Sequence, residues 1–260
     1  MPKLNNRADL EGLQKKLQTA STSKEKCRIH VCAGLGCVTK GALKVHEALA
    51  AALEKRGLLG SIDLYLKGEH EGVTAVKTGC LGLCEAGPVV HVSRGDVLYV
   101  NVTPENAEAI VEKTALKGEL VEEILPRDGQ KVCRTIREVP FYAKQQKIVL
   151  RNCGVIDPTD IRDYIAHQGY AALIGCIFDS NPEKTVELML DSGLRGRGGA
   201  GFSTGRKWKF AAAEKNEQKY VIVNADEGDP GAFMDRSVLE GDPHSVIEGA
   251  AIAAFAIGAN

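Results

Sequence analysis

Four of the eight cysteines occur as two closely spaced pairs. Four residues separate Cys32 from Cys37 within CAGLGC, and three separate Cys80 from Cys84 within CLGLCEAGP. Four thiolates supplied by two loops suit a 2Fe–2S cluster, which takes two sulfur ligands on each iron. The glycines allow backbone amides to approach the cluster sulfurs. Structural zinc is the alternative, but zinc knuckles favour the tighter C-x2-C turn, so the spacing predicts the 2Fe–2S cluster.

The segment 194–208, LRGRGGAGFSTGRKW, is a second candidate site. Its glycines allow backbone N–H groups to converge on an anion, and a helix capped by Ser203 or Thr204 would present its N-terminus there. Its basic side chains suit a phosphate, and its aromatic ones suit a flat ring. GRGGAG fits the G-x-G-x-x-G pattern but follows a predicted helix, which excludes a Rossmann fingerprint. We predict a nucleotide-binding loop; the alternative is a flexible surface loop.

An acidic loop, NADEGDPG at 224–231, follows a predicted strand at 220–224. Carboxylates are acceptors, so they do not bind phosphate but suit hydroxyls, ring N–H groups or a ribose diol. A cofactor with an anionic end and a hydroxylated or N–H-bearing part would use both loops. The alternative is a solvated acidic turn.

The elements that must position the cysteines form a compact α/β unit over residues 25–118, preceded by a helix within residues 1–24. Each cysteine pair falls in a loop after a predicted strand. We expect helices at 10–17, 41–55 and 105–116, and strands at 27–32, 61–66, 74–77, 89–92 and 97–102.

Breakers at Pro126, Asp128-Gly129 and Pro140 predict a linker over residues 119–147. A second unit follows over 148–260. Capping residues before prolines predict helix starts at 158 and 182, and further helices are expected from 204 to 210 and from 243 to 259. The last helix is so apolar that it needs a cover, so we expect the chain to be the front portion of a longer protein.

The bulk composition excludes several classes of protein. A net charge of −1 gives no nucleic-acid footprint. No apolar run reaches the roughly 18 residues of a membrane span, and no signal peptide is visible, so we expect a cytoplasmic protein with free thiols. Outside the paired cysteines, Cys27 and Cys176 are predicted to be core thiols, whereas Cys133 and Cys153 have no assigned role.

Two resemblances follow from these motifs. Residues 27–116, with the CAGLGC and CLGLCEAGP loops, resemble thioredoxin-like 2Fe–2S ferredoxins. GLRGRGGAGFSTGRKWKF and YVIVNADEGDPGAFMDR look like the flavin-carrying, NADH-oxidising subunit of complex I and its soluble diaphorase relatives in hydrogenases and formate dehydrogenases. The implied fold class is α/β: a thioredoxin-like ferredoxin domain followed by the N-terminal part of a complex I flavin-subunit-like FMN-binding domain.

The resemblance implies residue roles. Asp229 stands where complex I subunits usually have glutamate, and Ser203 where they have proline, which leaves NAD(H) and NADP(H) both open. The family's 4Fe–4S cysteines have no counterpart here and are expected only in a missing C-terminal part. The residues that would face FMN are Gly196, Arg197, Gly198, Gly199, Lys207, Asn224, Asp226 and Glu227. Those that would face the nicotinamide dinucleotide are Phe202, Lys207, Phe210 and Asp229.

The implied activity is that of an NAD(P)H dehydrogenase (diaphorase) module, which passes electrons between NAD(P)H, FMN and iron–sulfur clusters. The implied partners are a small 2Fe–2S thioredoxin-like subunit and a hydrogenase or formate dehydrogenase catalytic subunit, in a hetero-oligomer. Two alternatives stay open. The chain is a non-catalytic 2Fe–2S electron-transfer or assembly module whose incomplete flavin domain only docks partners, or it is a zinc-stabilised interaction protein.

Overall fold

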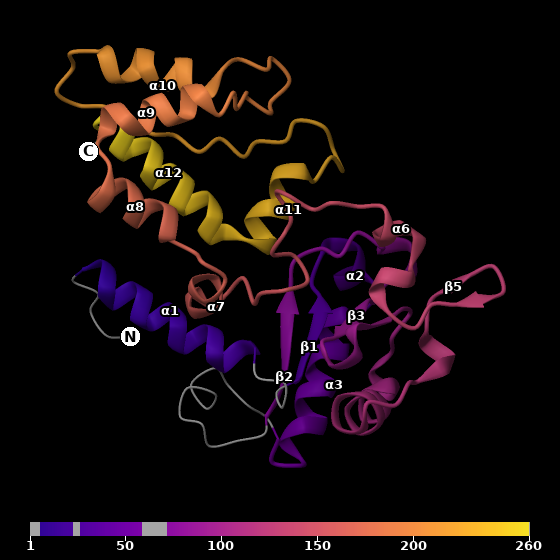
Figure 1. Cartoon of the computed structure of the whole chain (residues 1–260). Coiled ribbons are helices and arrows are strands. Elements are labelled where there is room, and N and C mark those ends of the chain that lie inside the picture. Colours follow the sequence, from indigo (N-terminus) through magenta and orange to yellow (C-terminus); the bar gives the residue numbers. More distant parts are fainter. Residues whose placement is uncertain (1–5, 23–26, 59–71, 260) are drawn as a thin grey trace.

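The computed structural model describes residues 6–22, 27–58 and 72–259. Its main sheet has four strands in the order β2-β1-β3-β4 (Figure 1). β1 (Cys27–Cys32) runs parallel to β2 (Val73–Thr78) and antiparallel to β3 (Val90–Val92), which pairs with β4 (Val97–Tyr99). The strands predicted in these places are confirmed, although β4 ends at Tyr99, and the strand predicted at 61–66 lies outside the described residues.

Helices cover the sheet and complete its core. α2 (Leu35–Thr39) and α3 (Ala42–Glu54) follow β1, and η3 (Pro104–Asn106), α5 (Ala107–Ala109) and η4 (Ile110–Lys117) follow β4. Because side chains alternate along a strand, one face of β1 places Ile29 and Val31 in the core with Val45 and Leu49 of α3. The other face carries Arg28 and His30, which contact Asp163 and the Val155 carbonyl of the following helical region.

The segment predicted as a linker packs onto this core. It contains η5 (Glu122–Ile124), a small hairpin of β5 (Arg127–Asp128) and β6 (Lys131–Val132), η6 (Ile136–Glu138) and α6 (Pro140–Ala143). Its apolar residues, spaced between the breakers, join the same hydrophobic cluster as the sheet: Val121, Ile124, Leu125, Cys133 and Val139. The turn-forming residues therefore divide this segment into short elements, and its apolar residues still pack on the core of the sheet.

The remaining elements form a helical region (Figure 1). α1 (Arg7–Thr22) packs against α7 (Ile161–Ala166), where Leu10 and Leu17 meet Ile165 and Ala166. The long helix α12 (Pro243–Ile257) contacts α8 (Ala171–Asp179), α9 (Pro182–Asp191), α10 (Thr204–Ala213) and α11 (Met234–Gly241). No helix among the described residues is long and apolar enough to cross a membrane.

Capping side chains explain where these helices begin. Asn181 accepts the Lys184 amide at the start of α9, and Ser203 accepts the Arg206 amide at the start of α10, as predicted. The helix start predicted at residue 158 is wrong. Asp157 forms a local turn with the Thr159 amide, and α7 begins only after Asp160 accepts the Arg162 amide.

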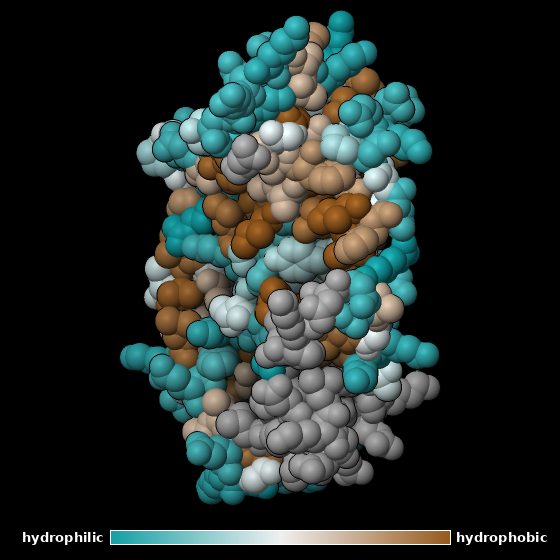
Figure 2. Space-filling model, turned by 90° about the vertical axis from the view of Figure 1, so that its left-hand side faces the viewer, coloured by the Kyte–Doolittle hydropathy of each residue, from teal (hydrophilic) through white to brown (hydrophobic). Residues whose placement is uncertain are grey.

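The strand predicted at 220–224 is also wrong, because this segment has no regular secondary structure. Tyr220 is 73% exposed and Ile222 85% exposed. No strand among the described residues lies beside this segment to complete a ladder, and isolated β structure is not stable. Apolar side chains also gather in the upper half of Figure 2, over the region where Figure 1 places α8, α9 and α12.

Candidate functional site

The four paired cysteines meet at one edge of the sheet. β1 ends at Cys32 and its last residue is in register with Thr78, the last residue of β2. The loops that follow therefore start side by side. One leads through Gly34 to Cys37 in α2, and the other leads through Cys80 to Cys84 at the start of η1 (Cys84–Ala86).

The thiols of these four residues lie near enough to influence one another. Cys32 shifts the pKa values of Cys37 and Cys80, and Cys80 shifts that of Cys84. Cys32 and Cys37 are each 1% exposed, Cys80 is partly buried and Cys84 is exposed. A cofactor held by these sulfurs would therefore meet solvent on the Cys84 side.

Glycines let the two loops approach this closely. A Cβ on Gly34 would lie 2.9 Å from Cys80 Cβ, one on Gly36 would lie 2.7 Å from Cys84 Cβ, and one on Gly87 would lie 2.8 Å from Cys37 Sγ. Contacts this short do not occur between real side chains, so each position needs glycine. The structure thus forms a cradle around the sulfurs that a single added methyl group would disrupt.

Two backbone amides already point at the sulfurs. Leu81 N donates to Cys32 Sγ at 3.4 Å, and Gly82 N donates to Cys80 Sγ at 3.3 Å. Amide donors of this kind stabilise thiolate ligands. The four thiols, the glycine cradle and the aimed amides fit a 2Fe–2S cluster. Among the described residues, no group of three or more His, Cys, Asp or Glu side chains is placed to hold a single metal ion.

The pKa values of the Cys32 and Cys37 thiols are shifted in opposite directions. The hydrogen bond with Cys37 and burial raise the pKa of Cys32 to about 11. The same bond lowers the pKa of Cys37. Because metal ligands must be thiolates, cluster binding at this centre releases protons and is favoured by higher pH.

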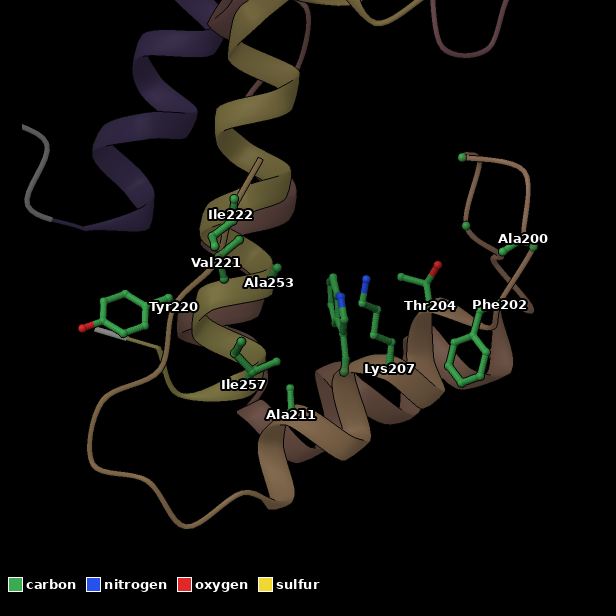
Figure 3. A pocket seen from close by; sticks show the side chains of 14 residues that line it. Ala200, Phe202, Thr204, Lys207, Ala211, Tyr220, Val221, Ile222, Ala253 and Ile257 are labelled. Atoms are coloured by element: carbon green, nitrogen blue, oxygen red, sulfur yellow. The ribbon is translucent and has the colours of Figure 1, made fainter. Parts of the chain in front are cut away.

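The glycine loop lines a separate cavity of about 580 Å³ (Figure 3). The loop is closed by Gly196 N donating to Phe202 O at 2.8 Å and Thr204 N donating to Leu194 O at 2.9 Å. In Figure 3 the Lys207 ammonium points into the space between this loop and the strip at 220–222. The cavity is therefore basic and amide-rich at one end and apolar at the other.

The cavity brings together only part of the predicted flavin and nicotinamide site. Gly196, Gly198, Phe202 and Lys207 line it, together with Trp208. The lining also contains residues for which the sequence predicted no cofactor contact: Ala200, Gly201, Thr204, Ala211, Tyr220, Val221, Ile222, Ala253 and Ile257. Predicted residues outside the lining are Arg197, Gly199, Phe210, Asn224, Asp226, Glu227 and Asp229.

The acidic loop makes local contacts instead. Asn224 Oδ1 accepts the Asp226 amide at 2.9 Å. Glu227 accepts the amides of Asp235 at 2.7 Å and Arg236 at 3.2 Å, so it caps the start of α11. Desolvation raises the pKa of Glu227, but the amide hydrogen bonds outweigh it and lower the pKa overall. This carboxylate stays ionised and holds α11 to the loop.

α11 connects the acidic loop to the cysteine centre. A cavity of about 260 Å³ lies between them, lined on one side by the cysteine loops with Cys80 and Cys84, and on the other by Phe233 and Arg236. The guanidinium of Arg236 lies 5.0 Å from the centre of the Phe233 ring. Both residues stand in the quoted flavin motif, but nothing in their spacing indicated contact with the cysteines.

Single cysteines outside the centre have structural positions. Cys27, Cys133 and Cys153 are buried, whereas Cys176 is only partly buried. The core-thiol prediction is thus confirmed for Cys27, and Cys176 does not reach the core. Burial raises the pKa of Cys153 to about 11. Its Sγ fills the close contact between Gly79, beside the cysteine centre, and Gly241 at the end of α11.

Two separate parts of the chain match known protein families. The family model for thioredoxin-like [2Fe-2S] ferredoxin matches residues 18–115, and that for the Nuo51 FMN-binding domain matches residues 189–260. An NADP-reducing hydrogenase subunit, HndC, from Solidesulfovibrio fructosivorans is 59% identical over 116 residues, which are 45% of this chain and 23% of the relative.

The alpha subunit of the NAD-reducing hydrogenase HoxS from Cupriavidus necator is 31% identical over 243 residues, 90% of this chain and 35% of the relative. The chain therefore spans between about a quarter and a third of these curated relatives. A crystal structure of a thioredoxin-like [2Fe-2S] ferredoxin from Aquifex aeolicus is 26% identical, with a TM-score of 0.31, over 39% of this chain and 97% of that one.

These matches confirm the resemblance that the motifs indicated. Residues 18–115 are thus similar to thioredoxin-like [2Fe-2S] ferredoxins, and residues 189–260 are similar to the Nuo51 FMN-binding domain.

Proposed function

We propose that this chain is the electron-transfer part of an NAD(P)H dehydrogenase (diaphorase), which passes electrons between NAD(P)H, FMN and iron–sulfur clusters. The observation that carries the proposal is the shared cavity, in which Phe233 and Arg236, just beyond the acidic loop, face Cys80 and Cys84. Electron transfer needs two centres close together, and this arrangement brings the two motif regions into contact.

The residues divide into two binding sets. Cys32, Cys37, Cys80 and Cys84 would hold the 2Fe–2S cluster as thiolates. The Gly198 amide, with the Lys207 ammonium, would hold the FMN phosphate. When bound, FMN would supply the conversion between two-electron hydride chemistry and the one-electron steps of iron–sulfur clusters.

The chain's own groups orient and enclose these cofactors. Lys207 and the amide-rich loop neutralise an anion at the N-terminus of α10, where the helix dipole adds to the attraction. The apolar end of the cavity, with Trp208, Ile222 and Ala253, suits a flat ring. Phe202, Phe210 and Asp229 are the proposed contacts of the nicotinamide dinucleotide, and Asn224, Asp226 and Glu227 complete the proposed flavin contacts.

The proposed setting is a cytoplasmic hetero-oligomer. Two relatives are named as subunits of NADP- and NAD-reducing hydrogenases, which supports a hydrogenase catalytic subunit as the partner. A formate dehydrogenase catalytic subunit in its place, and a small 2Fe–2S thioredoxin-like subunit beside it, belong to the same proposal. Because those two names differ in coenzyme, the proposal covers both NADH and NADPH.

A non-catalytic electron-transfer or assembly module is the second candidate. It is favoured by the position of the acidic loop outside the glycine-loop cavity. Glu227 caps α11, and Asn224, Asp226 and Asp229 do not line the cavity. In this case the cluster would work, and the second region would only dock partners.

The test is an anaerobic titration of the protein with FMN, followed by NADH or NADPH. The diaphorase proposal expects bound flavin that is bleached by one of the coenzymes, with reduced-cluster EPR signal appearing only when FMN is present. A Cys80→Ser variant should keep the bleaching and lose the EPR signal. Cluster without any flavin binding would overturn the proposal in favour of the second candidate.

A further inference from the structure

Helix α6 places two aromatic side chains on the loop that carries Cys80. Tyr142 Oη donates a hydrogen bond to the Leu81 carbonyl at 2.7 Å. Phe141 packs over Gly82, where an added Cβ would lie 3.1 Å from its ring. The segment that contains α6 is neither a ligand loop nor part of the flavin motifs, so none of the roles assigned above explains these contacts.

The tyrosine bond acts on a peptide group that already serves the cysteine centre. The Leu81 carbonyl and the Gly82 N–H belong to the same peptide unit, and that N–H donates to Cys80 Sγ at 3.3 Å. The atoms therefore form a continuous relay: Tyr142 O–H to Leu81 C=O, then Gly82 N–H to Cys80 Sγ. Donation to the carbonyl polarises the peptide and makes its N–H a stronger donor.

The surroundings fix this relay in place. Gly82 has φ +87°, a conformation that glycine adopts without strain. The C=O and N–H of the planar trans peptide before it point in opposite directions, toward Tyr142 and Cys80. Lys147 Nζ lies 5.3 Å from the centre of the Tyr142 ring and covers it as a cation–π contact. The Phe141 ring lies edge-on to it, with the ring centres 5.0 Å apart, so two neighbours hold the tyrosine ring in place.

We propose that Tyr142 is a positioning residue that strengthens the Gly82 amide bond to Cys80 Sγ and so raises the reduction potential of the cluster. This inference rests on the proposed assignment of the four cysteines to a 2Fe–2S cluster. Reduction adds negative charge to the cluster, and a stronger amide donor stabilises that charge. Without the hydroxyl, the reduced form is stabilised less.

The test is Tyr142→Phe, which keeps the ring and its packing and removes only the relay. EPR-monitored redox titration of the purified holoprotein should show reduction about threefold less favourable, a shift of roughly 28 mV to lower potential at 59 mV per tenfold change for one electron. Tyr99→Phe is the matched control. It also removes a buried hydroxyl, one that bonds Thr114 and Val121 instead of the cysteine loops, and it should leave the potential unchanged.

A second variant keeps the test decisive if Tyr142→Phe does not assemble a cluster. Site-specific 3-fluorotyrosine at position 142 retains the bond with a more acidic donor, and it should shift the potential upward. A fully loaded cluster whose potential is the same in wild type, Tyr142→Phe and the fluorotyrosine protein would overturn the relay. A folded protein that binds no iron would instead overturn the four-cysteine assignment on which the relay depends.

Discussion

The two candidate sites differ in how the chain holds them. The cysteine centre stands where two strands in register end together, and its proposed ligands Cys32 and Cys37 are each 1% exposed. The glycine-loop cavity is lined by α10, the C-terminal end of α12 and irregular loops, and its lining includes Phe202 at 51% exposure and Ile222 at 85%. Backbone pairing of β1 with β2 fixes where the cysteine loops begin. The loops that line the glycine-loop cavity depend instead on apolar contacts, and the described residues supply only part of these.

The cysteine centre should therefore fail completely when one ligand is lost. Cys80→Ser removes one of the four proposed ligands, so we expect iron and acid-labile sulfide to fall from about two each per chain to near zero. Cys176→Ser is the control, because this partly buried thiol stands outside the centre. Chemical analysis measures the iron in both variants. A Cys80→Ser protein with full iron would contradict the dependence of the cysteine centre on each of its four thiols.

Packing in the second region can be tested where helices touch. In Gly205→Ala the added Cβ would lie 2.5 Å from the Leu190 backbone nitrogen, where α10 crosses α9. We expect a loss of about 1–3 kcal/mol in the free energy of unfolding, measured by urea denaturation. At Gly198 an added Cβ meets nothing within 4 Å, so Gly198→Ala should be nearly neutral for stability. Equal losses in the two variants would contradict this packing.

The cavity itself is tested by two neighbouring lysines. Lys207 lines the glycine-loop cavity, whereas Lys209 lines a different depression beside α9. Removing a cation that pairs with phosphate should weaken binding, so we expect Lys207→Ala to lower FMN affinity roughly tenfold. Lys209→Ala should change it little. Flavin fluorescence titration measures both, and an equal effect in the two variants would move the phosphate site elsewhere.

The contact between the regions carries the smallest expected effect. His30 donates from Nε2 to the Val155 carbonyl at 3.1 Å, and burial, then the nearby His91 and Arg28 charges, lower its pKa to about 3. The unfolded chain binds the proton near pH 6.5, so folding stability falls as pH drops below that value.

Between about pH 7.5 and pH 6 this linkage should cost roughly 1 kcal/mol of unfolding free energy. Urea denaturation at both pH values measures the loss, and His30→Gln should flatten the dependence. A His30→Gln protein that loses as much stability as the wild type over this interval would show that the imidazole is not the titrating group.

The sequence was most informative where chemistry and secondary structure coincide. Cys32 ends β1 and Cys80 follows β2, and the spacing of the two cysteine pairs predicted that they meet. Asn181 and Ser203 indicated helix starts because capping is local. The strand at 220–224 was wrong because a β-branched apolar run forms a strand only beside a partner. The contact of Arg236 with the cysteine loops and the relay through Tyr142 join residues far apart in sequence, and no local pattern encodes them.

The most direct test of the account is the low-temperature EPR spectrum of the anaerobically purified chain after dithionite reduction, with iron, sulfide, zinc and extractable flavin measured on the same sample. We predict a brown protein with a rhombic 2Fe–2S signal that disappears in Cys80→Ser and persists in Cys176→Ser. A colourless protein that holds stoichiometric zinc would contradict the redox assignment of the cysteine centre.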